Sequence, residues 1–196
     1  MTTPDILSAL NPVITAFENL SIQHYIGGSI ASSIYGMART TMDIDIVADC
    51  KIYHVSALKQ LLENNYYVDE NMMLEAIRTK TSFNLIHSAT TLKIDIFIYD
   101  DDPFQRSAID RKVKDKLDEE HDSEYYFSSP EDTIIAKLQW YDQGNSVSER
   151  KWLDIIGIMK VQAQRLDQRY LEIWSKRLGF YDLLKKTLAD SGLNIQ

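Results

Sequence analysis

The stretch from Tyr25 to Val47 constrains the fold of this chain more than any other part of the sequence. It predicts a strand that ends at Ile26, a turn built on two glycines, a helix over 29–35 and a second strand. The second strand carries Asp43 and Asp45. Because side chains on a strand alternate between its two faces, these carboxylates point the same way.

The carboxylate pair and the glycine turn predict complementary binding chemistry. Asp43 and Asp45 on a rigid strand suit hard divalent cations such as Mg²⁺ or Mn²⁺, which prefer oxygen ligands. Gly27 and Gly28 let the backbone approach a ligand, and the following helix presents free N–H groups to an anion. Together they predict a site for a nucleoside triphosphate. The structural alternatives are an idle exposed strand face, a plain tight turn, and a Ser29 that caps its helix instead of binding phosphate.

The motif order resembles that of the nucleotidyltransferase superfamily, in which Gly-Ser is followed by Asp-x-Asp. Here these elements are Gly28-Ser29 and Asp43-Ile44-Asp45. The fuller pattern is similar to the branch that contains AbiEii-type toxins of bacterial toxin–antitoxin systems, through Gly27, Gly28, Ser29, Gly36, Arg39, Thr41, Asp43 and Asp45.

A third carboxylate follows on a predicted hairpin formed by residues 82–87 and 92–98. Asp95 lies in the middle of the second strand, where aspartate is depleted in purely structural strands. The resemblance implies a third catalytic carboxylate on a neighbouring strand, and Asp95 matches it. Alternatively, Asp95 only faces solvent. The run from Asp100 to Pro103 is typical of a turn and helix cap and is not counted in the metal site.

Two residues before the metal-binding strand are assigned to nucleotide binding. The planar fork of Arg39 suits a phosphate, although it could also pair with an acidic neighbour. Thr41 is assigned through the resemblance alone. Ser29 joins them as a phosphate ligand or a cap.

Ser129 and Pro130 open a helical C-terminal part of the chain. The AbiEii-like branch has a lysine and an aspartate in later motifs, and the resemblance implies catalytic roles for Lys137 and Asp154. The match is incomplete, because Lys151 is not followed directly by an aspartate. The structural alternatives are a Lys137 stem that covers apolar surface and an ion pair of Asp154 with Arg150 one turn away.

The fold predicted from this resemblance is α/β (α+β). It is a nucleotidyltransferase core with a small mixed β-sheet over 1–126, followed by a helical domain over 127–196. The N-terminal helix, predicted over 3–20, is expected to kink or split at Pro12.

Composition and charge narrow the function further. The net charge of −8 over 196 residues argues against an extended nucleic-acid-binding surface. The four histidines lie far apart without ligand spacing, which argues against a zinc site. The single Cys50, the lack of a signal peptide and the lack of a membrane-length apolar run favour a cytoplasmic protein without a membrane partner.

The function predicted from the resemblance is transfer of a nucleoside monophosphate from an NTP to an acceptor hydroxyl. Asp43, Asp45 and Asp95 would bind Mg²⁺ or Mn²⁺, and the acceptor is an RNA, a protein or a small molecule. Membership of a toxin–antitoxin pair adds a cognate antitoxin as a partner. The alternative is a catalytically idle nucleotidyltransferase-like module that binds a partner without turnover.

Overall fold

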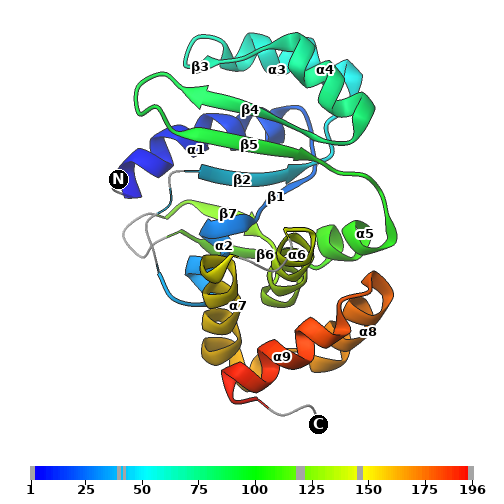
Figure 1. The fold of residues 1–196 in the computed structure, drawn as a ribbon. Helices are drawn as coiled ribbons and strands as arrows, with labels where there is room; N and C mark the ends of the chain where they lie inside the picture. The colour runs from blue at the N-terminus through cyan, green and yellow to red at the C-terminus, as the bar shows by residue number, and fades with distance from the viewer. Residues whose placement is uncertain (1–2, 39–40, 42, 118–121, 145–147, 194–196) are drawn as a thin grey trace. The chain divides into compact units, whose positions relative to one another are not determined.

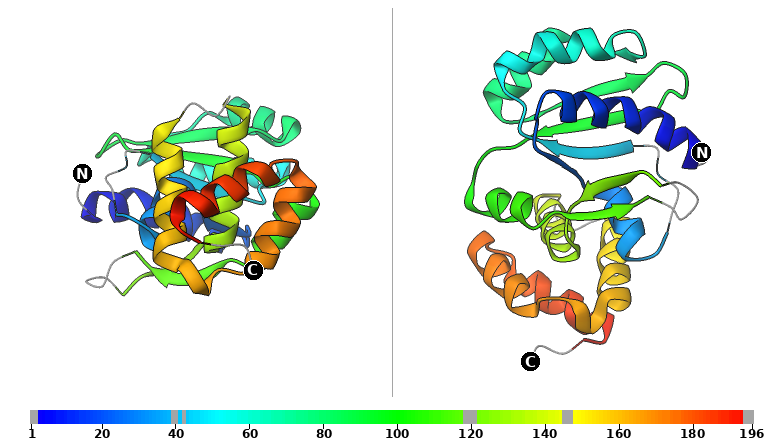
Figure 2. Two further views of the ribbon diagram at one scale, coloured as in Figure 1. Left: turned by 60° about the horizontal axis from the view of Figure 1, so that its bottom comes forward. Right: turned by 180° about the vertical axis from the view of Figure 1, so that it is seen from behind.

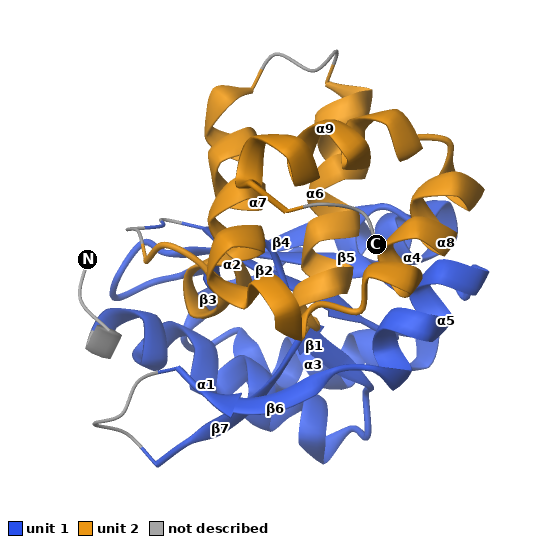
Figure 3. Ribbon diagram, turned by 90° about the horizontal axis from the view of Figure 1, so that it is seen from below, with its two compact units in different colours: residues 1–30, 40–127 blue, residues 31–39, 128–196 orange. Residues whose placement is uncertain are grey.

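The computed structural model describes residues 3–38, 41, 43–117, 122–144 and 148–193 (Figure 1). The chain forms two compact units (Figure 3). The first contains residues 1–30 and 40–127, and the second contains 31–39 and 128–196. The domain division expected from the sequence stays a prediction. In the described parts of the chain, every helix is too short or too polar to cross a membrane.

The first unit is built on a seven-stranded mixed sheet in the order β3-β4-β5-β2-β1-β7-β6. The strand pairs β2/β5 and β1/β7 are parallel, and the other neighbours are antiparallel. The β4–β5 hairpin is confirmed. The strands are β1 (His24–Ile26), β2 (Asp43–Ala48), β3 (Tyr66–Tyr67), β4 (Ser82–His87), β5 (Lys93–Ile98), β6 (Val113–Lys116) and β7 (Glu124–Phe127).

One face of β2 and β5 forms the core of the first unit. Ile44, Ile46, Ile94 and Ile96 are fully buried, and each contributes about 1.5–3 kcal/mol by leaving water. Figure 2, seen from behind, shows α1 lying across the sheet. The helices of this unit are α1 (Thr3–Asn19), α3 (Val55–Leu62), α4 (Glu70–Thr79) and α5 (Pro103–Asp110), with a 3-10 turn η1 (Ile52–His54); α2 (Gly28–Tyr35) begins here and ends in the second unit.

Pro12 does not split the first helix, because α1 continues through it. Leu10 and Val13, on either side of the proline, are fully buried, so the helix is held by its apolar face. Ser8, whose carbonyl would have accepted the missing hydrogen bond, is an exposed residue where water can replace the donor.

The second unit is helical in its described C-terminal part, as predicted. Its helices α6, α7 and α8 begin after side-chain caps from Ser129, Ser148 and Asp167. The elements are α6 (Pro130–Gln143), α7 (Glu149–Gln162), the 3-10 turn η2 (Ala163–Arg165), α8 (Gln168–Leu178) and α9 (Tyr181–Ser191).

Two acidic residues in the first turn of α6 accept hydrogen bonds from other parts of the second unit. Asp132 is 1% exposed and accepts hydrogen bonds from Ser129 Oγ and Tyr170 Oη, both at 2.6 Å. Glu131 is also buried and accepts from the Asp167 backbone N–H at 2.9 Å. These bonds fasten α6 to the start of α8, because buried carboxylates need such donors.

Candidate active site

The register of β2 and β5 brings two of the predicted carboxylates side by side. Asp45 and Asp95 are direct partners in this parallel pair, so they lie in one row across neighbouring strands. Adjacent strands are about 4.8 Å apart, which places both side chains within reach of one ion. Asp43 lies two residues before Asp45 on the same face. Asp43, Asp45 and Asp95 are called the carboxylate cluster below.

The cluster lies on the more open face of the sheet. The side chain of Asp43 is 58% exposed and that of Asp95 is 18% exposed, whereas the isoleucines between them on the other face are fully buried. The alternation read from the sequence therefore separates the carboxylates from the core. Their catalytic and metal-binding roles stay predictions.

Lys93 is a site residue that the sequence analysis did not single out. Its Nζ atom lies 2.8 Å from Asp95 Oδ2 and 4.0 Å from Asp43 Oδ1. The hydrogen bond with Asp95 raises the pKa of Lys93, and the charges of the carboxylate cluster add to this against the opposing effect of burial. The sequence contained the information needed to find Lys93, because the alternation of side chains along β5 places Lys93 and Asp95 on one face.

The carboxylate cluster offers only oxygen donors to a metal ion. Within the described ranges, three or more carboxylate, imidazole or thiol groups are nowhere gathered closely enough to form a metal site as they stand. However, the cluster already holds a stand-in cation, the Lys93 ammonium, through carboxylate oxygens. Oxygen donors of this kind fit Mg²⁺ or Mn²⁺.

The two glycines of the turn have different structural roles. The Gly27 N–H donates to the Asp45 carbonyl at 2.9 Å, which joins the turn to β2. Gly28 has a φ of +56°, and a Cβ atom there would lie 1.7 Å from Asp45 Oδ2. A Cβ atom on Gly27 would meet nothing within 4 Å. Gly28 is therefore the position at which backbone and carboxylate lie in direct contact.

The remaining nucleotide-binding candidates are placed as follows. Ser29 is half-buried in the first turn of α2, beside Gly28. Thr41 is buried, and its hydroxyl donates to the Asp43 carbonyl at 3.0 Å, so it fixes the start of β2. Arg39 lies outside the described residues. Gly36 serves packing in the second unit, since a Cβ there would lie 2.8 Å from the Ile158 backbone nitrogen of α7.

Lys137 and Asp154 are brought together in the second unit. Lys137 Nζ on α6 lies 2.8 Å from Asp154 Oδ2 on α7. Their side chains are only 12% and 9% exposed. The sequence analysis did not consider this pairing, and it differs from both structural alternatives, because the amine is engaged and its partner lies on another helix.

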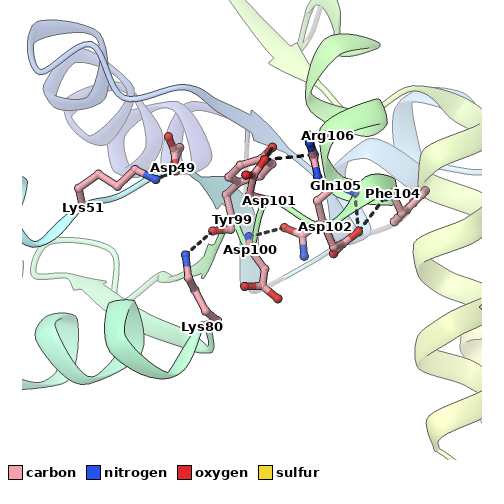
Figure 4. A network of polar contacts seen from close by, with 10 residues as sticks. All are labelled: Asp49, Lys51, Lys80, Tyr99, Asp100, Asp101, Asp102, Phe104, Gln105 and Arg106. Carbon is pink, nitrogen blue, oxygen red and sulfur yellow. Dashed lines mark hydrogen bonds and ion pairs between the residues drawn. The ribbon is translucent and has the colours of Figure 1, made fainter.

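The aspartates after β5 form a separate polar network at the opposite end of that strand from Lys93 (Figure 4). Asp102 caps α5 by accepting from the Phe104 and Gln105 N–H groups, which confirms the predicted cap. Asp101 accepts from Tyr99 Oη at 2.9 Å and pairs with Arg106 Nε at 3.3 Å. Burial, together with this bond to Asp101, raises the pKa of Tyr99 to about 12. The network stabilises the strand-to-helix turn.

Solved structures share this architecture. The solution structure of the antibiotic-resistance factor ANT(2'')-Ia aligns with a TM-score of 0.59 at 12% identity, over 94% of this chain and 97% of that chain. A crystal structure of the same protein in complex with adenylyl-2''-tobramycin gives 0.55 at 13% identity, over 91% and 98%. An antigenic nucleotidyltransferase-like protein from Paracoccidioides brasiliensis gives 0.55 at 16% identity, over 94% of each chain.

These likenesses show that the chain has the nucleotidyltransferase fold, as predicted. Identities of this size establish the fold alone. No protein-family model matches the sequence, and no curated protein sequence matches it. The assignment to the AbiEii-like branch stays a prediction.

Proposed function

We propose that this chain is a metal-dependent nucleotidyltransferase that moves a nucleoside monophosphate from an NTP to an acceptor hydroxyl. The observation that carries the proposal is the row formed by Asp95, Asp45 and Gly28. Two carboxylates on adjacent parallel strands face the same way, and the glycine turn lies against one of them. This combination offers oxygen ligands for a cation beside backbone N–H groups for a phosphate.

The carboxylate cluster would hold Mg²⁺ or Mn²⁺. Bound there, the ion would neutralise charge on the attacking and leaving oxygens of an in-line displacement. Asp95, which is less exposed than Asp43, would accept the proton of the acceptor hydroxyl. The acceptor oxygen forms a bond to the α-phosphorus, the bond from that phosphorus to the β-bridging oxygen breaks, and pyrophosphate leaves.

The backbone around the glycine turn would orient the triphosphate. Gly28 permits close approach, and the first N–H groups of α2 with the Ser29 hydroxyl can donate to phosphate oxygens. Thr41 would act indirectly by fixing the first residue of β2. Arg39 would add positive charge to the phosphates. Positioning and charge neutralisation would supply most of the rate acceleration.

Lys137 and Asp154 are proposed for catalysis on the resemblance alone. Their ion pair is consistent with a lysine whose position is fixed by Asp154. The acceptor is proposed only as a hydroxyl of an RNA, a protein or a small molecule. A cognate antitoxin likewise rests on the resemblance, and it is tested by co-purification with the product of a neighbouring gene.

The test is transfer of α-labelled NMP from each of the four NTPs, in the presence of Mg²⁺ or Mn²⁺. Acceptors would be bulk RNA, a protein extract, the chain itself and tobramycin, an adduct of which one structural neighbour binds. Asp43→Asn with Asp45→Asn should lower transfer by at least about a hundredfold, the scale of lost transition-state charge stabilisation. Asp122→Asn, at a fully exposed position, is the matched control.

Label transfer that survives the double variant would refute the assigned site. Absence of both label transfer and metal-dependent NTP binding would instead favour an idle partner-binding module.

A further inference from the structure

The position of Lys93 calls for a functional explanation. Lys93 lies two residues before Asp95 on one strand and is the register partner of Asp43 on the next. Its ammonium reaches both carboxylates, at 2.8 and 4.0 Å. The basic group therefore lies beside Asp43 on the neighbouring strand and next to Asp95 on the same face of its own strand.

A positive charge at this place has a clear electrostatic effect. Like charges on neighbouring strands destabilise a sheet, and the carboxylate cluster gathers three of them in a chain of net charge −8. The Lys93 ammonium offsets this repulsion for as long as other cations are absent.

We propose that Lys93 is a built-in counter-cation of the carboxylate cluster and that a divalent cation takes its place, so that Lys93 sets the metal affinity of the site. This inference rests on the proposed function, in which the cluster binds metal. Lys93 engages Asp95 Oδ2, one of the two carboxylate oxygens that Asp95 can offer to a metal. A divalent ion and the ammonium also repel each other at this distance, so metal binding must break the ion pair.

The ion pair is placed where it can be broken. The Lys93 side chain is 42% exposed, so its flexible stem can carry the ammonium into water. An exposed pair of this kind contributes little net free energy and is screened by salt. Lys93 can thus give way to a metal ion without disturbing the core below the cluster.

The experiment is calorimetric titration of nucleotide-free protein with manganese(II) chloride. Lys93→Met should bind Mn²⁺ about fivefold more tightly than the unmodified chain, the upper range for losing one exposed ion pair. Its melting temperature should be lower without metal and should rise further when Mn²⁺ is added. Lys93→Gln is a second neutral variant in case methionine impairs folding.

Two controls separate the proposed role from a general charge effect. Lys93→Arg keeps the positive charge and should bind Mn²⁺ like the unmodified chain. Lys59→Met removes a lysine of similar exposure, 40%, which is not part of the carboxylate cluster. Its Nζ atom pairs with Glu70 Oε2 at a distance of 3.3 Å. It should also leave the Mn²⁺ affinity unchanged.

Each outcome decides the proposal. Tighter binding by the neutral Lys93 variants alone supports it, including the case in which only these variants bind detectably. Unchanged or weaker binding by them, or an equal gain with Lys59→Met, overturns it and leaves the proposed function standing. If neither the unmodified chain nor any variant binds Mn²⁺, this inference is overturned, and the label-transfer assay decides the proposed function separately.

Discussion

Two lysine–aspartate ion pairs have the same length and different surroundings. Lys93 and Asp95 in the first unit, and Lys137 and Asp154 in the second, each have an Nζ–Oδ2 distance of 2.8 Å. The first pair is 42% and 18% exposed, and the second is 12% and 9% exposed. Distance therefore does not decide what an ion pair contributes; burial does, because it sets the cost of separating the charges. We therefore expect another cation to replace Lys93 in the more exposed pair, called the open pair below, at little cost. The buried pair of Lys137 and Asp154 joins α6 to α7.

The largest effect is expected from breaking the buried pair. Lys137→Met should lower the free energy of unfolding by about 3–5 kcal/mol, because Asp154 would remain as an uncompensated buried charge. Adding Asp154→Leu should recover most of that loss. Urea denaturation measures both variants, with the exposed Lys160→Met on α7 as the control. A loss below about 1 kcal/mol for Lys137→Met would show that the two pairs are alike.

A smaller loss of unfolding free energy is expected at the glycine turn beside Asp45 of the carboxylate cluster. Gly28→Ala should destabilise the chain by about 2 kcal/mol or more, because its left-handed backbone costs about 1–2 kcal/mol and its Cβ would overlap the Asp45 carboxylate. Gly27→Ala, with open space around its Cβ, should stay close to the unmodified chain. Denaturation midpoints test the contrast, and Asp45→Ala in the Gly28→Ala background should restore part of the loss. Equal effects at the two glycines would contradict the contact with Asp45.

A further test of burial uses His24 in the first unit. His24 is buried, its Nδ1 lies 2.9 Å from the Ile22 carbonyl oxygen, and burial lowers its pKa below 6.5. The unfolded chain then binds more protons than the folded chain between the two pKa values. The free energy of unfolding should therefore fall as the pH drops below about 6.5. His24→Phe should reduce this slope in urea denaturation between pH 7.5 and pH 5, and an unchanged slope would assign the effect to other groups.

The smallest effect is expected from the open pair. Lys93→Met should lower the free energy of unfolding by about 1 kcal/mol or less without added metal. The loss should disappear in about 1 M sodium chloride, where exposed charges are screened within about 3 Å, whereas the loss caused by Lys137→Met should persist. Thermal melts at low and high salt measure this difference. A salt-independent loss at Lys93 would show that its pair is buried in solution.

Much of the fold followed from local patterns in the sequence. Alternation on β2 and β5 separated Asp43, Asp45 and Asp95 from the buried isoleucines, and this separation is seen in the structure. The caps at Asp102 and Ser129 were also predicted, because capping depends on a few adjacent residues. Of the kink or split predicted at Pro12, the split does not occur, since packing of α1 outweighs the lost hydrogen bond, and the kink stays a prediction.

The chain by itself therefore determined which residues share a strand face, where helices begin and which turn carries the glycines, because these depend on neighbours within a few residues. The resemblance implied that Asp95 lies on a strand next to the acidic one, and the tertiary structure decided the register that sets it directly opposite Asp45. Only the tertiary structure decided that Lys93 lies among the acids and that Lys137 pairs with Asp154. It also decided that Gly28, and not Gly27, touches a carboxylate. The physical reason is that strand register and helix pairing join residues distant in sequence, and burial sets the energy of each contact once those partners have met.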